Sequence, residues 1–165
     1  MKKILYIINL VFLLASIEAC TGYKPIFDAS KVAFKINDYS LSGDRNLGNK
    51  IYYKLYNFSR SNENSTGSKD IYLKINTNKN KNATSKNSAG KVIEYRISLS
   101  AQIIIKDLST GNEILNETFS ESSLYKVQDQ FSETIKLENK SMENLINTIY
   151  QNLLIKLSEN IIYKW

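Results

Sequence analysis

Residues 93–105, Ile-Glu-Tyr-Arg-Ile-Ser-Leu-Ser-Ala-Gln-Ile-Ile-Ile, carry the clearest structural signal in this chain of 165 residues. Apolar and polar side chains alternate along this stretch, from Ile93 to Gln102. A repeat of two residues predicts a long β-strand that is buried on one face and wet on the other, as in antiparallel sheets. Residues 107–112, Asp-Leu-Ser-Thr-Gly-Asn, favour a turn, and residues 113–120 resume the strand pattern, so we expect a hairpin.

Two further strands and one polar segment precede this hairpin. Residues 32–36 and 70–77 alternate in the same way, and the second stretch places three large aliphatic side chains on one face. Residues 78–88 are rich in Asn, Lys and Ser, a composition typical of loops. We therefore expect a mobile connection between strands at residues 78–88.

Two segments have the period of an amphipathic helix instead. In residues 44–60 apolar side chains recur every three or four positions, and either Asp44 or Asn46 can cap the first turn. Residues 132–163 carry a longer apolar stripe, which has to be buried against the apolar face of the sheet. The stripe consists of Ile135, Met142, Leu145, Ile146, Ile149, Leu153, Leu157 and Ile161.

Together these elements predict an α+β fold. We expect a two-layer sandwich, in which a four-stranded antiparallel or mixed sheet carries two helices on one face, in the order β-α-β-β-β-α. The length fits a single domain, which we place at residues 31–165, after a segment 1–19 and a tether 20–30.

The chemistry available to this chain is narrow. It contains one cysteine, Cys20, and no histidine, so intramolecular disulfides, cysteine metal sites, Ser-His triads and the usual zinc ligands are excluded. A secreted hydrolase would need a Ser-Lys or a carboxylate site, and no pair of carboxylates is placed in one cleft by the pattern. We predict a protein that is not an enzyme and that has no cofactor and no metal site.

The N-terminal segment predicts secretion and a lipid anchor. Lys2 and Lys3 precede an apolar run at residues 4–14, which is too short to span a bilayer and fits a signal peptide. The sequence Ile17-Glu18-Ala19-Cys20 resembles a lipobox, so we expect cleavage between Ala19 and Cys20 and an N-palmitoyl, S-diacylglycerol cysteine at Cys20. The alternative is an ordinary signal peptide in which the cysteine is accidental. Thr21 stands where an Asp would follow the cysteine in lipoproteins that are retained, so the resemblance to known lipoprotein sorting implies passage to the outer membrane.

The chain is basic, with a formal net charge of +6, and about +5 remains once residues 1–19 are removed. A secreted, anchored protein does not meet the genome, so nucleic acid is disfavoured, while an anionic lipid or glycolipid stays open. Ordinary solvated surface lysines are the alternative to an anion-binding role. The candidate contacts for such an anionic ligand are Lys79, Lys81, Lys86, Lys91, Arg96 and Lys106.

The residues after the predicted cleavage site resemble a known family. Cys20-Thr21-Gly22-Tyr23-Lys24-Pro25-Ile26-Phe27 resembles the mature start of the lipopolysaccharide-assembly lipoprotein LptE, with Thr21 inserted between the usual Cys and Gly. Three later parts of the chain are also similar to that family: the strand segment Tyr95 to Leu99, the turn at Thr110-Gly111 and the segment Ser123-Leu124-Tyr125.

This resemblance implies a function without a catalytic cycle. Family members lie inside the lumen of the outer-membrane β-barrel LptD, act as its plug and assembly partner, and bind lipopolysaccharide. The resemblance thus implies a lipid-anchored protein that faces the periplasm and the barrel lumen. The alternative is a lipid-binding auxiliary lipoprotein of an intermembrane lipid transport system. That alternative predicts an apolar pocket between helices and sheet, whereas a plug needs a filled core and a polar outer surface.

Overall fold

The computed structural model describes residues 33–61 and 68–164. The predicted signal peptide, tether and lipidation site at Cys20 lie outside the described residues. Within the described part the elements are β1 (Phe34–Gly43), α2 (Arg45–Ser61), β2 (Lys69–Lys86), β3 (Val92–Asp107), β4 (Glu113–Lys126) and α3 (Phe131–Lys164). The predicted order β-α-β-β-β-α is confirmed.

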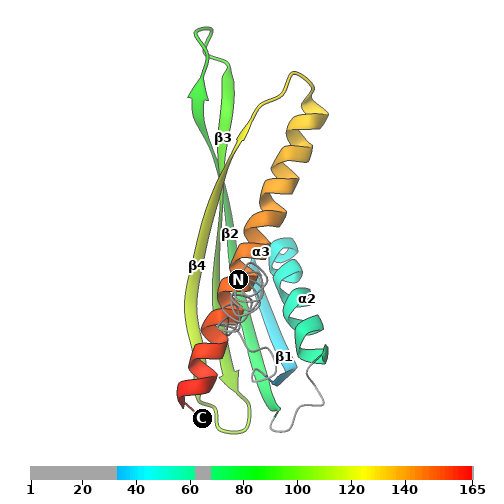
Figure 1. Cartoon of the computed structure of the whole chain (residues 1–165), viewed down its shortest axis with the longest axis vertical. Coiled ribbons are helices and arrows are strands. Elements are labelled where there is room, and N and C mark those ends of the chain that lie inside the picture. The colour runs from blue at the N-terminus through cyan, green and yellow to red at the C-terminus, as the bar shows by residue number, and fades with distance from the viewer. Residues whose placement is uncertain (1–32, 62–67, 165) are drawn as a thin grey trace, which may run out of the picture.

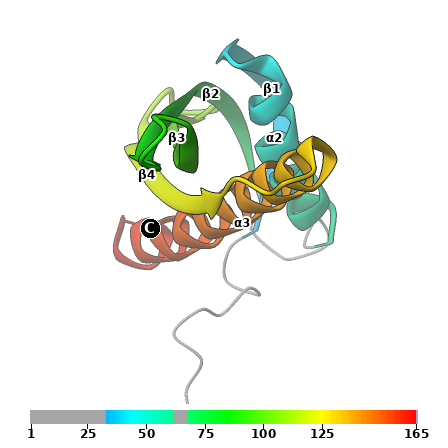
Figure 2. The same ribbon diagram turned by 90° about the horizontal axis from the view of Figure 1, so that it is seen from above.

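The four strands form one mixed sheet in the order β1-β2-β3-β4. The edge strand β1 runs parallel to β2, while β2–β3 and β3–β4 are antiparallel. Figures 1 and 2 show a long, strongly twisted sheet, with α3 crossing one of its faces obliquely and α2 lying beside β1. The expected two-layer α+β sandwich is therefore present.

The core lies between the sheet and the two helices. On β3 the buried side chains alternate from Ile97 to Ile105, as the pattern of residues 93–105 predicts. Side chains from α2 and α3 join them in one continuous cluster, which accounts for most of the apolar stripes of both helices. In the predicted stripe of α3, Ile135 is instead 36% exposed, and the side chain of Ile161 lies outside the described part. The largest fully buried side chains are Ile51, Leu55, Ile71, Leu73, Ile75, Ile97, Leu99, Ile103, Ile105, Ile146, Ile149 and Leu153.

The expectation of a mobile connection at residues 78–88 is wrong. Strand β2 continues to Lys86, and its backbone pairs with β3 from Asn78 opposite Ser100 to Lys86 opposite Val92. We call this part of the hairpin the arm. On its β2 side no side chain from Asn78 to Lys86 is buried, and its turn end extends beyond the start of α3 (Figure 1), so the β2 sequence shows no apolar pattern here. The arm is held in a regular strand conformation by backbone hydrogen bonds between β2 and β3, which polar residues form as well as apolar ones.

The edge strands are also longer than predicted. A register shift between Ile36 and Asp38 breaks the alternation in β1, so the pattern ended there while the strand continues to Gly43. On β4 the polar stretch after Ser120 keeps its pairing with β3 up to Lys126. In both cases the apolar period stops before the hydrogen-bonded ladder does.

A tight turn fixes the start of α2 against the sheet. Gly43 has φ +72°, and a Cβ there would lie 1.9 Å from the carbonyl oxygen of Thr77. The Thr77 carbonyl accepts a hydrogen bond from the Asp44 amide at 2.8 Å, and the Thr77 hydroxyl donates to the Asp44 carbonyl at 2.6 Å. The Asp44 side chain caps α2 by accepting from the amides of Asn46 and Leu47.

Candidate functional site

The six basic residues predicted as anion contacts fall in four different places. Residues opposite one another in a ladder share a face, so Lys79 and Lys81, opposite Leu99 and Ile97, lie on the helix side of the sheet. Lys86 and Lys91 flank the turn at the end of the arm. Arg96 and Lys106 lie on the outer face, ten residues apart on β3, or about 33 Å at 3.3 Å per residue. The structure thus brings only pairs together, and anion binding stays a prediction for all six.

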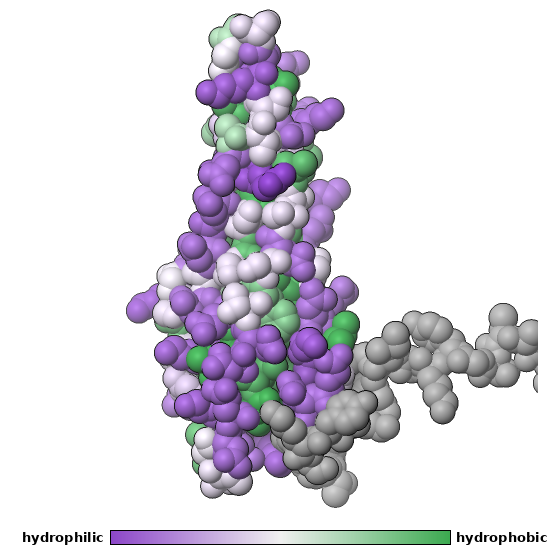
Figure 3. Space-filling model, turned by 90° about the vertical axis from the view of Figure 1, so that its left-hand side faces the viewer, coloured by the Kyte–Doolittle hydropathy of each residue, from purple (hydrophilic) through white to green (hydrophobic). Residues whose placement is uncertain are grey.

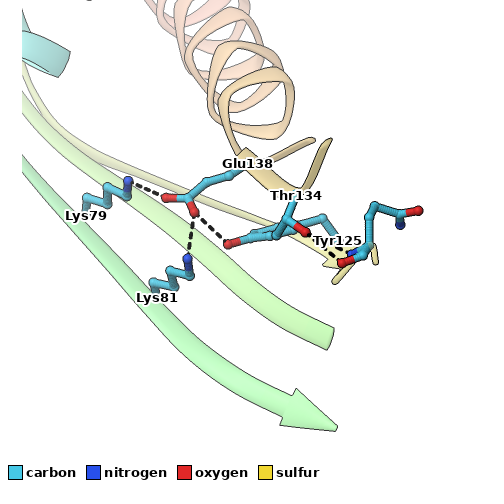
Figure 4. Close-up of polar contacts among 6 residues, drawn as sticks. Lys79, Lys81, Tyr125, Thr134 and Glu138 are labelled. Carbon is cyan, nitrogen blue, oxygen red and sulfur yellow. Dashed lines mark hydrogen bonds and ion pairs between the residues drawn. The ribbon is translucent and has the colours of Figure 1, made fainter. Parts of the chain in front are cut away.

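Lys79 and Lys81 converge on a carboxylate that the sequence pattern did not single out. The Lys79 ammonium donates to Glu138 Oε1 at 2.9 Å, and the Lys81 ammonium donates to Glu138 Oε2 at 2.6 Å. The Tyr125 hydroxyl donates to the same Oε2 at 2.8 Å (Figure 4). We call Lys79, Lys81 and Tyr125 the donor cradle. All three donors come from β2 and β4, and the anion comes from α3.

Aromatic rings hold the second lysine of the cradle. The Lys81 nitrogen lies 4.4 Å from the ring centroid of Tyr95 and 5.6 Å from that of Tyr125. The two rings stack on each other with centroids 5.8 Å apart. The negative faces of these rings favour a cation at this position, in addition to its contact with Glu138.

The charged forms of Glu138 and Lys81 are strongly favoured in the folded protein. Burial of Glu138, whose side chain is 12% exposed, is the largest single effect and raises its pKa. The hydrogen bonds from Lys81, Lys79 and Tyr125 together outweigh burial and lower the pKa of Glu138 from 4.5 to about 2. The hydrogen bond to Glu138 raises the pKa of Lys81 to about 12. A sequence signal did exist, because Glu138 lies one helical turn before Met142 on the buried stripe of α3.

The outer face of the sheet is a second candidate surface. Three successive cross-strand rows of β2, β3 and β4 contain only uncharged polar side chains, and we call these nine residues the neutral face. They are Asn76, Gln102, Thr118, Asn78, Ser100, Ser120, Asn80, Ser98 and Ser122. The Ser100 and Ser120 hydroxyls are 3.0 Å apart, and part of the neutral face lines a shallow hollow of about 360 Å³. In the view of Figure 3, white and green residues run up the middle of the molecule between hydrophilic, purple margins.

Two further observations concern the described residues only. Across residues 33–61 and 68–164 no group of three or more acidic, Cys or His residues is arranged to hold a metal ion. None of the helices in the described part is long and apolar enough to cross a membrane.

Comparison with solved structures places the fold. No family model and no curated protein matches the sequence. Rare lipoprotein B from Shewanella oneidensis aligns with a TM-score of 0.54 at 17% identity, over 78% of this chain and 100% of that chain. Lipoprotein B from Nitrosomonas europaea aligns with a TM-score of 0.56 at 14% identity, over 82% and 89%. A minor lipoprotein from Acinetobacter baumannii aligns with a TM-score of 0.54 at 18% identity, over 76% and 91%.

Proposed function

We propose that this chain, which has the fold of the rare lipoprotein B and LptE-like lipoproteins, is an outer-membrane lipoprotein anchored through Cys20. In this proposal it plugs the LptD β-barrel, assists the assembly of that barrel, and aids the insertion of lipopolysaccharide at the cell surface. The neutral face is the observation that carries the proposal. The lumen of a barrel is polar and hydrated, and a sheet face of Asn, Ser, Thr and Gln side chains can hydrogen-bond to such a wall without burying a charge.

The position at which the described chain begins supports an orientation of the domain in which the lipid anchor and the arm lie at opposite ends. Phe34 pairs with Lys69 at the start of β2, whereas the arm ends after Lys86. Eighteen residues of strand span about 60 Å, so the lipid on Cys20 would tether one end of the molecule while the arm points away from it. Lys86, Lys91 and Arg96 are exposed at the arm end and would meet the phosphates of lipopolysaccharide there.

The filled core favours the plug over the lipid-carrying alternative. An auxiliary lipoprotein that holds acyl chains needs apolar space between its helices and its sheet. In this chain aliphatic side chains of β2 and β3 are buried against those of α2 and α3 in one continuous cluster. The hollows lined by described residues have polar or mixed walls at the surface, such as that beside Ser98 and Ser122.

The test is the identity of the protein that co-purifies with the tagged chain from gently solubilised membranes. A large β-barrel in equal amount is expected, and Cys20→Ser should remove the chain from the membrane fraction. Asn78→Lys places a charge on the neutral face and should abolish co-purification, whereas Asn139→Lys, on the exposed side of α3, should not. Recovery of an acylated wild-type chain without a barrel would overturn the proposal and leave the transport-auxiliary alternative in first place.

A further inference from the structure

The donor cradle is built as an anion site. Two ammonium groups and a phenol from two strands point at one position, and the carboxylate at that position belongs to a different layer of the fold. The strands hold the backbone positions of the three donors independently of Glu138, because β2 and β4 are both paired to β3 at these residues, and the Tyr95 and Tyr125 rings add a second contact for the Lys81 ammonium. The donor cradle therefore has the geometry of an anion-binding site that is occupied by the Glu138 carboxylate.

The charges of the cradle are not balanced by its present occupant. Lys79 and Lys81 supply two positive charges, and Glu138 supplies one negative charge. A phosphate monoester carries −1.5 to −2 at neutral pH and has three strong acceptor oxygens, one for each donor. The two lysine side chains are 35% and 34% exposed, so an anion can reach them from solvent.

We propose that Lys79, Lys81 and Tyr125 form a phosphate-binding site in which Glu138 is a built-in competitor. A phosphate group displaces the carboxylate, accepts hydrogen bonds from the three donors, and leaves Glu138 to rotate toward water. The binding is thereby weakened and made selective for dianions, because every ligand has to compete with a carboxylate held at high effective concentration. That the phosphate belongs to a glycolipid rests on the proposed function, whereas the phosphate site itself does not.

The test compares the binding of inorganic phosphate to the wild-type chain and to Glu138→Gln. The substitution keeps the size of the side chain and removes its charge, so we expect phosphate to bind at least about tenfold more tightly, which corresponds to 1.4 kcal/mol. The double variant Glu138→Gln with Lys81→Met should lose this gain. Glu143→Gln is the matched control, because Glu143 also lies on α3 but pairs with Lys50 and Lys54 at 3.4 and 3.5 Å on the surface.

A second variant guards against loss of folding. Glu138→Asp keeps the charge but withdraws it by one methylene, and it should bind phosphate with an affinity between those of the wild type and Glu138→Gln. Circular dichroism establishes that each variant is folded. No tightening in either variant beyond that of Glu143→Gln, or a gain that persists without Lys81, would overturn the proposal.

The source of the phosphate is distinguished with vesicles. Phosphatidylcholine vesicles containing phosphatidic acid present a phosphate monoester at a lipid surface, and vesicles of phosphatidylcholine alone do not. If Glu138→Gln binds the vesicles that contain phosphatidic acid and not those of phosphatidylcholine alone, the ligand is a lipid headgroup. If it binds inorganic phosphate but neither kind of vesicle, the ligand is a soluble phosphate. Neither binding assay involves the barrel, so the absence of phosphate binding would overturn this proposal without bearing on the co-purification test of the proposed function.

Discussion

Replacing Glu138 by Gln should destabilise the folded domain by about 3 kcal/mol at neutral pH. The fall in the pKa of Glu138 from 4.5 to about 2 measures how much better the folded state holds the charged form. At 1.36 kcal/mol per pKa unit this amounts to about 3 kcal/mol. The side chain is only 12% exposed, so solvent screens these interactions much less than it would screen a surface pair.

The pH dependence provides the sharper part of this prediction. Because the pKa of Glu138 is lower in the folded state, its contribution is complete above pH 4.5 and is lost as the pH falls toward 2. The difference in unfolding free energy between the wild type and Glu138→Gln should therefore be constant from pH 7 to about pH 5. It should shrink steadily below that range and nearly vanish at pH 2.

Urea unfolding followed by circular dichroism at a series of pH values measures this difference. Glu143→Gln removes a carboxylate that is 45% exposed, and exposed ion pairs contribute about 0–1 kcal/mol, so this control should change little. Equal losses in Glu138→Gln and Glu143→Gln, or a difference that stays constant down to pH 2, would refute the assignment of Glu138 as the anchor of the cradle.

The remaining predictions concern the turn and the core. Gly43→Ala should cost about 3 kcal/mol or more, because its Cβ would overlap the Thr77 carbonyl, whereas Gly90→Ala, with φ +78° and open space, should cost about 1 kcal/mol. Leu153→Ala, at a fully buried position, should cost about 2–5 kcal/mol, whereas Ile155→Ala, at a position 37% exposed, should cost about 1 kcal/mol or less. Thermal and urea unfolding measure both pairs, and equal losses within either pair would contradict the corresponding packing argument.

The hydrophobic period predicted the elements that bury apolar side chains. The alternation from Ile97 to Ile105 and most of the stripes of both helices correspond to the observed core, because burial is what selects apolar residues at a fixed spacing. Ile93 and Ile135 follow the same spacing but are 41% and 36% exposed. The same reasoning failed at residues 78–86, where β2 pairs with β3 but none of its own side chains is buried. Composition there reflects exposure to water, and exposure does not distinguish a solvated strand from a loop.

The site was missed for a related reason. Lys79 and Lys81 were singled out as cations, but their partner Glu138 lies 59 residues from Lys79 and 57 residues from Lys81 along the chain. Only the crossing of α3 over the sheet brings Glu138 to the two lysines. A charged residue on an apolar stripe is informative about burial but does not identify its partner. The pairing becomes predictable only once the sheet register is known, because register decides that Lys79, Lys81 and Tyr125 face the helix layer.

The position of the cradle explains why a charged group is buried there at all. It lies at the end of the aliphatic core, since Ile97 is fully buried on β3, the residue opposite it on β2 is Lys81, and the next row on this face pairs Tyr95 with Tyr125. At this point the ionic contact of Glu138 with Lys79 and Lys81 joins α3 to the sheet. An apolar contact would hold the arm against the helix permanently, whereas a carboxylate between two lysines can be exchanged for another anion. The same residues can thus stabilise the contact between α3 and the sheet and bind a phosphate, which is why stability and phosphate binding should change in opposite directions in Glu138→Gln.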